Sequence, residues 1–453
     1  MSKPSRKLVL GAFMSGSGTQ GDSWRHPRSD TQAYHDFSLY AGYAQTLERG
    51  KFDALFFYDN VQPVDDLAQL ARQPGVPRWD PLILITALAV VTKHIGLIAT
   101  ASTSYNSPYN LARRLASIDV LSSGRAGWNV VTSTGGGENF NLDQHLDHAD
   151  RYARAHEFYD VVTGLWDSFA DDAVLADKAS GEWIDPERVR RLDHKGSNFS
   201  VRGPLNSPRP IQGYPVIAQA GGSDAGRELA ARLGEFLYTA EYSIPEGIAF
   251  AQDVRERAVK YGRDPAHIKI APGVSPFVGR SDAEAWDKFE EWQSYRDTGA
   301  TLRGLSHYAT LGFDLSTLPL DEPITLPDVL PETNSHKSRQ SVLAQWIRTT
   351  RPTVRDVTRK LTAGGHRIVV GSPQTIADDF EEWFTSGAAD GFNIMFPSAP
   401  DGINDFVDLV VPELQRRGLF RTEYEGRTFR ENLGLPRVPN RHFAPRTAPV
   451  PAI

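Results

Sequence analysis

Short apolar runs alternate with longer amphipathic segments along most of the chain. The amphipathic segments repeat apolar residues every three or four positions, as in 109–121 (YNLARRLASIDVL), and this spacing predicts helices. The runs between them are short and rich in β-branched and aromatic residues, which predicts strands. Eight such runs begin at Leu8, Ala54, Ile95, Ala126, Pro215, Glu235, Ile268 and Phe392.

The alternation of strands and helices indicates an α/β fold. Several of the strand runs are apolar at every position, as expected of parallel strands that helices cover on both faces. Eight is the number of strands that closes a (β/α)8 barrel, the TIM barrel, and this is the predicted fold. An open doubly wound sheet is the alternative.

Two long segments interrupt the alternation. Residues 171–213 predict a small strand excursion that ends in prolines. Residues 281–371 combine a helix, a proline-rich stretch and a basic helix, and insertions of this length commonly serve as lids or interfaces. We therefore expect one barrel domain over residues 1–453 with these two insertions and an extended C-terminal arm over 419–453.

Composition narrows the class of protein. The 453 residues carry a formal net charge of -7, which argues against non-specific binding of nucleic acid. The longest apolar stretch, PLILITALAVV, is too short to span a membrane, and the N-terminal apolar run is too short for a signal peptide. The chain has no cysteine, so it forms neither disulfides nor thiolate sites. We expect a cytoplasmic protein.

A glycine pattern follows the first strand. Gly16, Gly18 and Gly21 have the spacing G-x-G-x-x-G, which binds dinucleotides when a helix follows directly. The next residues, DSWRHPRSD, contain Pro27 and lack helical periodicity. The pattern therefore favours a flexible loop over a nicotinamide site.

Polar residues mark the ends of several predicted strands. In a barrel, the active site lies at the C-terminal ends of the strands. Asp59 ends the second strand, Thr100 and Ser102 share one face of the third, and Asn129 lies in the fourth. These four residues are candidates to orient a ligand.

The fifth strand runs into the glycine-rich stretch QAGGSDAGRELAARL. Gly221 and Gly222 permit close backbone approach, and Ser223 stands where a helix N-cap is expected. Such a turn binds phosphate at the helix N-terminus, and it also occurs as a plain capped turn. The residues alone leave both interpretations open.

Histidines supply further candidates. Residues 143–150 hold Asp143, His145 and His148, but metal sites in barrels draw ligands from several strands, so a polar loop with no metal is favoured. His148 and Tyr152 are four residues apart and share a helix face. His26 and His307 are candidates for a general acid or an electrostatic partner, although a solvated loop histidine is the simpler interpretation of each.

Longer stretches carry a resemblance over nearly the whole chain. They include SWRHP, TLERGKFDALFFYD, SPYNLARRLASIDVLSSGRAGWNVVTS, NFNLDQHLDHADRYARAHEF, RGPLNSPRPIQGYPVIAQAG and GAADGFNIMFP. The chain resembles the flavin-dependent monooxygenases of the bacterial luciferase-like superfamily. Within it, the resemblance is to the group of nitrilotriacetate monooxygenase, pristinamycin synthase and dibenzothiophene sulfone monooxygenase.

The resemblance implies a TIM barrel with insertions that uses FMN as FMNH2 and O2 as co-substrate. A separate NAD(P)H:flavin reductase supplies the reduced flavin, and one oxygen atom enters a small organic substrate, such as an organosulfur compound, an amine or a heterocycle. Sulfone-active members carry a histidine in the loop after the first strand. Here that loop is SGTQGDSW, and this difference weakens the inference that the substrate is a sulfone.

The resemblance also assigns residues and partners. It places FMN against Asp59, Thr100, Ser102, Asn129, His148, Tyr152, Gly222 and Ser223. His307 and His26 become the candidates for catalytic groups, and a homodimer or homotetramer is expected. Two alternatives stay open: a deazaflavin-dependent oxidoreductase on the same barrel, and a non-catalytic flavin-binding protein.

Overall fold

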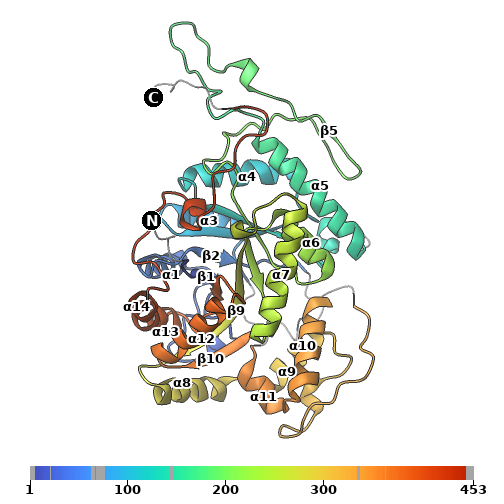
Figure 1. Cartoon of the computed structure of the whole chain (residues 1–453), viewed down its shortest axis with the longest axis vertical. Coiled ribbons are helices and arrows are strands. Elements are labelled where there is room, and N and C mark those ends of the chain that lie inside the picture. The colour runs from blue at the N-terminus through green and yellow to red at the C-terminus, as the bar shows by residue number, and fades with distance from the viewer. Residues whose placement is uncertain are drawn as a thin grey trace.

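A computed structural model describes residues 6–20, 22–62, 67, 77–141, 146–333, 337–362 and 364–444. Its centre is a barrel of parallel strands with helices around it (Figure 1). The barrel strands are β1 (Val9–Met14), β2 (Ala54–Phe57), β3 (Gly96–Ser102), β4 (Ala126–Val131), β7 (Val216–Gln219), β8 (Phe236–Thr239), β9 (Lys269–Val278) and β11 (Gly391–Ile394).

The sheet closes on itself. Strand β1 pairs in parallel with both β2 and β11, and the ring is completed where Phe236–Thr239 of β8 pairs with residues 269–272 of β9. This closure confirms the predicted (β/α)8 barrel and rules out the open doubly wound sheet. All eight predicted strand runs form barrel strands because both of their faces are buried, as in β2 and β7.

Helices pack their apolar faces on the outside of the barrel. They are α1 (Phe37–Arg49), α3 (Pro81–Ala89), α4 (Pro108–Leu121), α5 (His148–Trp166), α6 (Asp224–Leu233), α7 (Ile244–Lys260), α12 (Pro373–Thr385), α13 (Asp401–Asp405) and α14 (Val411–Arg416). Large side chains such as Trp128, Phe158 and Phe380 are fully buried between the two layers. No helix of the described residues is both long and apolar enough to cross a membrane.

The C-terminal segment closes the N-terminal end of the barrel. Helix α15 (Phe429–Asn432) inserts Phe429, which is fully buried with Phe236 and other interior residues of the barrel. Gly96 makes room for it, because a Cβ at that position would lie 2.5 Å from the Phe429 ring. Within the expected C-terminal arm, these residues thus form a plug.

The second interruption carries a small core of its own. It contains α8 (Asp282–Tyr295), α9 (Thr298–Tyr308), α10 (Lys337–Thr350) and α11 (Val354–Lys360), the last three of which lie together beside the barrel (Figure 1). Leu302, Leu305, Leu343 and Val357 are buried in this core. Tyr242, which follows β8, packs in the same core and joins it to the barrel.

One strand was missed by the sequence analysis. Strand β10 (Arg367–Gly371) pairs in parallel with residues 274–278 of β9, beyond the part of β9 that pairs with β8. The run RIVVG was included in the second insertion. Four of its five residues are only partly buried, so it lacks the fully buried pattern of the barrel strands.

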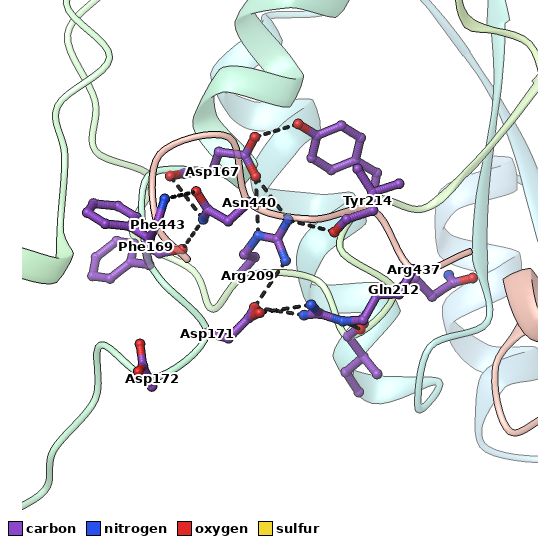
Figure 2. Close-up of polar contacts among 12 residues, drawn as sticks. Asp167, Phe169, Asp171, Asp172, Arg209, Gln212, Tyr214, Arg437, Asn440 and Phe443 are labelled. Carbon is purple, nitrogen blue, oxygen red and sulfur yellow. Dashed lines mark hydrogen bonds and ion pairs between the residues drawn. The ribbon is translucent and has the colours of Figure 1, made fainter. Parts of the chain in front are cut away.

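The first interruption projects from the barrel together with the last described residues (Figure 1). It contains the predicted strand excursion, as the antiparallel pair β5 (His194–Lys195) and β6 (Ser200–Val201). Figure 2 shows how the end of α5, this insertion and residues 437–443 join. Asp167 is fully buried and pairs with Arg209 at 3.0 Å, while Arg441 donates to its other oxygen at 2.8 Å.

Candidate active site

A cavity of about 1110 Å³ opens at the C-terminal ends of the barrel strands. Loops that follow the strands line its base, and α9 and α10 of the second insertion line its mouth. This is the end at which barrel enzymes place their active sites. All of the residues assigned to FMN line it, namely Asp59, Thr100, Ser102, Asn129, His148, Tyr152, Gly222 and Ser223.

Thr100 and Asn129 form a pair at the base of the cavity. They are register partners on β3 and β4, and the Asn129 Nδ2 donates to the Thr100 Oγ1 at 2.9 Å. This bond directs the Asn129 amide, whose Oδ1 is buried without a hydrogen-bond partner. A buried acceptor of this kind costs free energy unless a ligand donor meets it. The N–H groups of a reduced isoalloxazine ring are donors that fit it.

Ser102 and Asp59 stand at neighbouring strand ends. The Ser102 hydroxyl lies 2.7 Å from the Ser133 hydroxyl, and it also accepts from the backbone N–H of Ser104. The Asp59 carboxylate accepts from the backbone N–H of Asn60 at 2.9 Å. Burial raises the pKa of Asp59 above its ordinary value, and the Asn60 bond opposes this rise. Both side chains keep polar atoms at the edge of the cavity.

The turn between β7 and α6 presents a helix N-terminus to the cavity. Ser223 is the N-cap, and its hydroxyl accepts from the backbone N–H of Gly226 at 3.1 Å. A Cβ on Gly226 would lie 2.8 Å from the carbonyl carbon of Gly221. The first turn of α6 therefore needs glycine at position 226 to lie this close to the β7–α6 turn. Free N–H groups and the helix dipole make such a turn a site for phosphate.

The first turn of α5 contributes to the same cavity. His148 and Tyr152 share a face as predicted, with ring centroids 4.8 Å apart. Arg151 also lines the cavity and is 2 % exposed, and its Nη1 donates to the Ser133 carbonyl at 2.9 Å. Arg151 was not predicted from the sequence, although it lies between His148 and Tyr152. This buried guanidinium adds positive charge to the cavity that the β7–α6 turn also lines.

Together these groups fit a flavin mononucleotide. The cavity offers a helix N-terminus and a buried cation, which suit the phosphate. The strand ends offer an unpaired acceptor and hydroxyls, which suit the polar edge of the ring.

The two histidine candidates have different positions. His307 lies on α9 and lines the mouth of the cavity. His26 is 3 % exposed and does not line the cavity. Its Nε2 lies 3.1 Å from Glu291 Oε1, and its ring stacks on Trp292 with centroids 4.3 Å apart. The structure thus places His26 apart from the other site candidates, where it joins the first loop to α8.

A third histidine, His366, was not predicted. It is buried just before β10, and its Nε2 lies 2.8 Å from the Tyr238 hydroxyl and 3.1 Å from Arg339 Nη2. Burial lowers the pKa of His366 well below its ordinary value, and the Arg339 cation lowers it further. The ring is therefore neutral. Because a guanidinium only donates, Nε2 is an acceptor.

The metal alternative concerned residues 143–150. Asp143 and His145 lie outside the described residues. Within the described part of the chain, no three histidine or acidic side chains come close enough together to hold a metal ion.

Comparison with known proteins identifies the family. The profile of the luciferase-like monooxygenases matches residues 19–390. The chain belongs to this family. It is 44% identical over 447 residues to nitrilotriacetate monooxygenase component A of Aminobacter aminovorans, covering 96% of this chain and 98% of that protein. It is also 44% identical over 447 residues to N-acetyl-S-(2-succino)cysteine monooxygenase of Bacillus subtilis (strain 168), covering 98% and 100%.

Solved structures agree. The crystal structure of DmoA from Hyphomicrobium sulfonivorans matches with a TM-score of 0.84 and 34% identity over 94% of this chain and 92% of that chain. The chain described here is thus an enzyme, a flavin-dependent monooxygenase of the luciferase-like family. An F420-dependent secondary alcohol dehydrogenase matches with a TM-score of 0.55 but only 14% identity, so it shares the fold alone.

Proposed function

We propose that this protein is the oxygenase component of a two-component system. It takes FMNH2 from a separate NAD(P)H:flavin reductase and uses O2 to place one oxygen atom in a small organic substrate. The observation that carries the proposal is the cavity at the strand ends, which combines a helix N-terminus, a buried arginine and the orphaned Asn129 acceptor. The relative from Aminobacter aminovorans is named as component A, which supports a second component here.

Each group of residues has a separate task. Ser223 and the backbone of Gly222 bind the phosphate, with His148, Tyr152 and Arg151 beside it. Asp59, Thr100, Ser102 and Asn129 orient the ring. Bound reduced flavin supplies the reaction with O2, and the protein supplies orientation and exclusion of water. The second insertion provides that exclusion, since α9 and α10 form the mouth of the cavity.

The relatives leave the substrate open. Two proteins at 44% identity are named for different compounds, nitrilotriacetate and N-acetyl-S-(2-succino)cysteine. We propose a small organic substrate, a homodimer or homotetramer, and a cytoplasmic location. A monomeric mass by light scattering at micromolar concentration would contradict the oligomer.

Transfer of labelled oxygen tests the proposal. The purified chain, a flavin reductase, NADH, FMN and 18O2 are combined with a panel of amines, organosulfur compounds and heterocycles. We expect one 18O atom in the product of a turned-over compound, and none when the reductase is omitted. Anaerobic hydride transfer with a deazaflavin would instead favour the reductase alternative. Flavin binding with no turnover of any compound would favour the binding protein.

His307→Ala is expected to separate turnover from flavin binding. His307 belongs to α9 and not to the β7–α6 turn that is assigned to the phosphate, so the Kd for FMNH2 is expected to stay near the parental value. Product formed per FMNH2 falls by about tenfold, the scale of one lost hydrogen bond, and H2O2 release rises. Stopped-flow binding measures the Kd for FMNH2, and a peroxide assay measures the release of H2O2. His35→Ala, an exposed histidine outside the cavity, is the matched control.

A further inference from the structure

Met395 places a thioether in the wall of the cavity. It follows β11 directly, and its backbone N–H donates to the Val274 carbonyl of β9 at 2.8 Å. Successive side chains of a strand point to opposite faces. Ile394 is buried in the core between the strands and the helices, and Met395 on the other face lines the cavity. Its sulfur therefore belongs to the wall of the proposed flavin site.

A thioether is an oxidisable group in this position. The chain has no cysteine and three methionines, at positions 1, 14 and 395. Among the described residues that line the cavity, Met395 alone contains sulfur. Peroxides convert a methionine thioether to a sulfoxide, which is polar where the thioether is apolar. An oxidant formed inside the cavity thus meets one sulfur atom in the described lining.

The Met395 sulfur lies against the Tyr238 hydroxyl. The hydroxyl oxygen is 3.3 Å from Met395 Sδ and 2.8 Å from His366 Nε2. A thioether is a weak acceptor, so the imidazole nitrogen is the stronger of these two partners. A sulfoxide oxygen is a polar acceptor and competes with His366 for the same hydroxyl. Oxidation of Met395 therefore disturbs side chains that line the cavity beside it.

Met14 is an internal comparison of nearly equal burial. It ends β1 and is 7 % exposed, against 6 % for Met395. Met14 packs in the core between the barrel and the helices and is not part of the cavity lining, whereas its neighbour Phe13 on the other face is. The two thioethers therefore differ in whether they face the cavity, not in how much of them is exposed.

We propose that Met395 is oxidised to its sulfoxide by H2O2 that forms in the cavity of this enzyme, and that this self-oxidation weakens binding of FMNH2. This inference rests on the proposed function. When no organic substrate is present, reduced flavin and O2 give FMN and H2O2, the side reaction that exclusion of water limits. The oxidant therefore comes from the enzyme's own cofactor and co-substrate.

The oxidation step needs no further reactant. The Met395 sulfur gives an electron pair to one peroxide oxygen, so an S–O bond forms while the O–O bond breaks. The second oxygen leaves with both hydrogens as water, so the sulfur is oxidised by two electrons and the peroxide is reduced by two. The added oxygen makes the wall beside Tyr238 larger and more polar, and burial of an unpaired polar group costs free energy.

Turnover without an organic substrate tests the proposal. The parental enzyme is incubated with a flavin reductase, NADH, FMN and 18O2, together with catalase, which destroys H2O2 that leaves the protein. Peptide mass spectrometry measures the 18O-labelled sulfoxide at each methionine. We expect Met395 to be oxidised at least about tenfold faster than Met14, because susceptibility follows access to the oxidant. H2O2 added with the same catalase and no flavin is expected to oxidise neither.

Met395→Leu and Met14→Leu are the matched variants, since leucine keeps a similar volume and has no sulfur. Anaerobic titration gives the Kd for FMNH2 before and after turnover, and each protein is compared with its own starting value. We expect the affinity of fully oxidised parental and Met14→Leu enzymes to fall about tenfold, the scale of one disrupted polar contact. Met395→Leu is expected to keep its starting affinity.

The outcomes separate this proposal from the function itself. Equal labelling of Met14 and Met395, or no labelled sulfoxide at Met395 when catalase is present, overturns the self-oxidation. A loss of FMNH2 affinity in Met395→Leu as large as the parental loss also overturns it. Failure of the parental enzyme to bind FMNH2 before any turnover overturns the proposed function instead.

Discussion

Replacing Asp167 with alanine is expected to lower the free energy of unfolding by about 3–5 kcal/mol, the range for breaking a buried ion pair. The Asp167 carboxylate is fully buried and accepts from Arg209 and from the Tyr214 hydroxyl (Figure 2). It also accepts from Arg441. Arg209 has a side chain that is 2 % exposed. Without Asp167 this guanidinium keeps, among the described residues, Asp171 and the Val438 carbonyl as partners. Urea unfolding followed by circular dichroism measures the loss.

Arg437→Met is the matched control. Arg437 pairs with Asp171 in the same network, but both side chains are nearly half exposed, at 47 % and 42 %. An exposed pair contributes at most about 1 kcal/mol, so this variant is expected to unfold close to the parental urea midpoint. FMNH2 binding is expected to survive in both variants when they are folded, because no residue of this network lines the cavity. Equal stability losses in the two variants would show that burial does not govern the network.

The network also explains why the packing of the C-terminal segment could not be predicted from the sequence. Asp167, Arg209 and Arg441 are far apart along the chain, and no local pattern links them. Arm-like composition after residue 419 predicts an extended segment. Burial of Phe429 in the barrel depends on Gly96 and Gly127, where an added Cβ would lie 2.5 Å and 3.3 Å from the Phe429 ring, and this is visible only when the strands are placed.

The barrel itself is predictable because its signal is local. Strands buried on both faces are continuous apolar runs, and eight of them were found. Strand β10 differs, since it begins with Arg367, which pairs with Asp379 at 2.9 Å, and is only partly buried until Gly371. Its pairing with β9 is a tertiary contact, which the local sequence RIVVG does not predict.

The residues of the candidate site also fall into those that local sequence predicts and those that depend on tertiary packing. Polar residues that end barrel strands, such as Asp59 and Asn129, follow from strand positions, and the structure brings them into one cavity. A single histidine in a loop carries no such information, and His26 lies outside the cavity lining. His366 and Arg151 were missed because their significance is burial beside the cavity, which periodicity alone does not reveal.

Ser223→Ala is expected to weaken binding of FMNH2 about ten- to hundredfold. A hydrogen bond to a charged group contributes about 1.5–3 kcal/mol, and about 1.4 kcal/mol is a tenfold change in Kd. The Ser223 hydroxyl caps α6 by accepting from Gly226, which leaves its own O–H to donate to a phosphate. Loss of the cap also lowers the free energy of unfolding by about 1 kcal/mol.

The two effects of Ser223→Ala are separable because riboflavin lacks the phosphate. Anaerobic titration with reduced riboflavin reports contacts to the ring, and titration with FMNH2 reports ring and phosphate together. We expect the variant to lose the preference for FMNH2 while it keeps the parental affinity for reduced riboflavin. Ser372→Ala is the control, since Ser372 caps α12 in the same way and lies outside the cavity lining. If Ser223→Ala binds FMNH2 as tightly as the parent while His307→Ala loses it, the phosphate lies at α9 and the assignment of the β7–α6 turn is wrong.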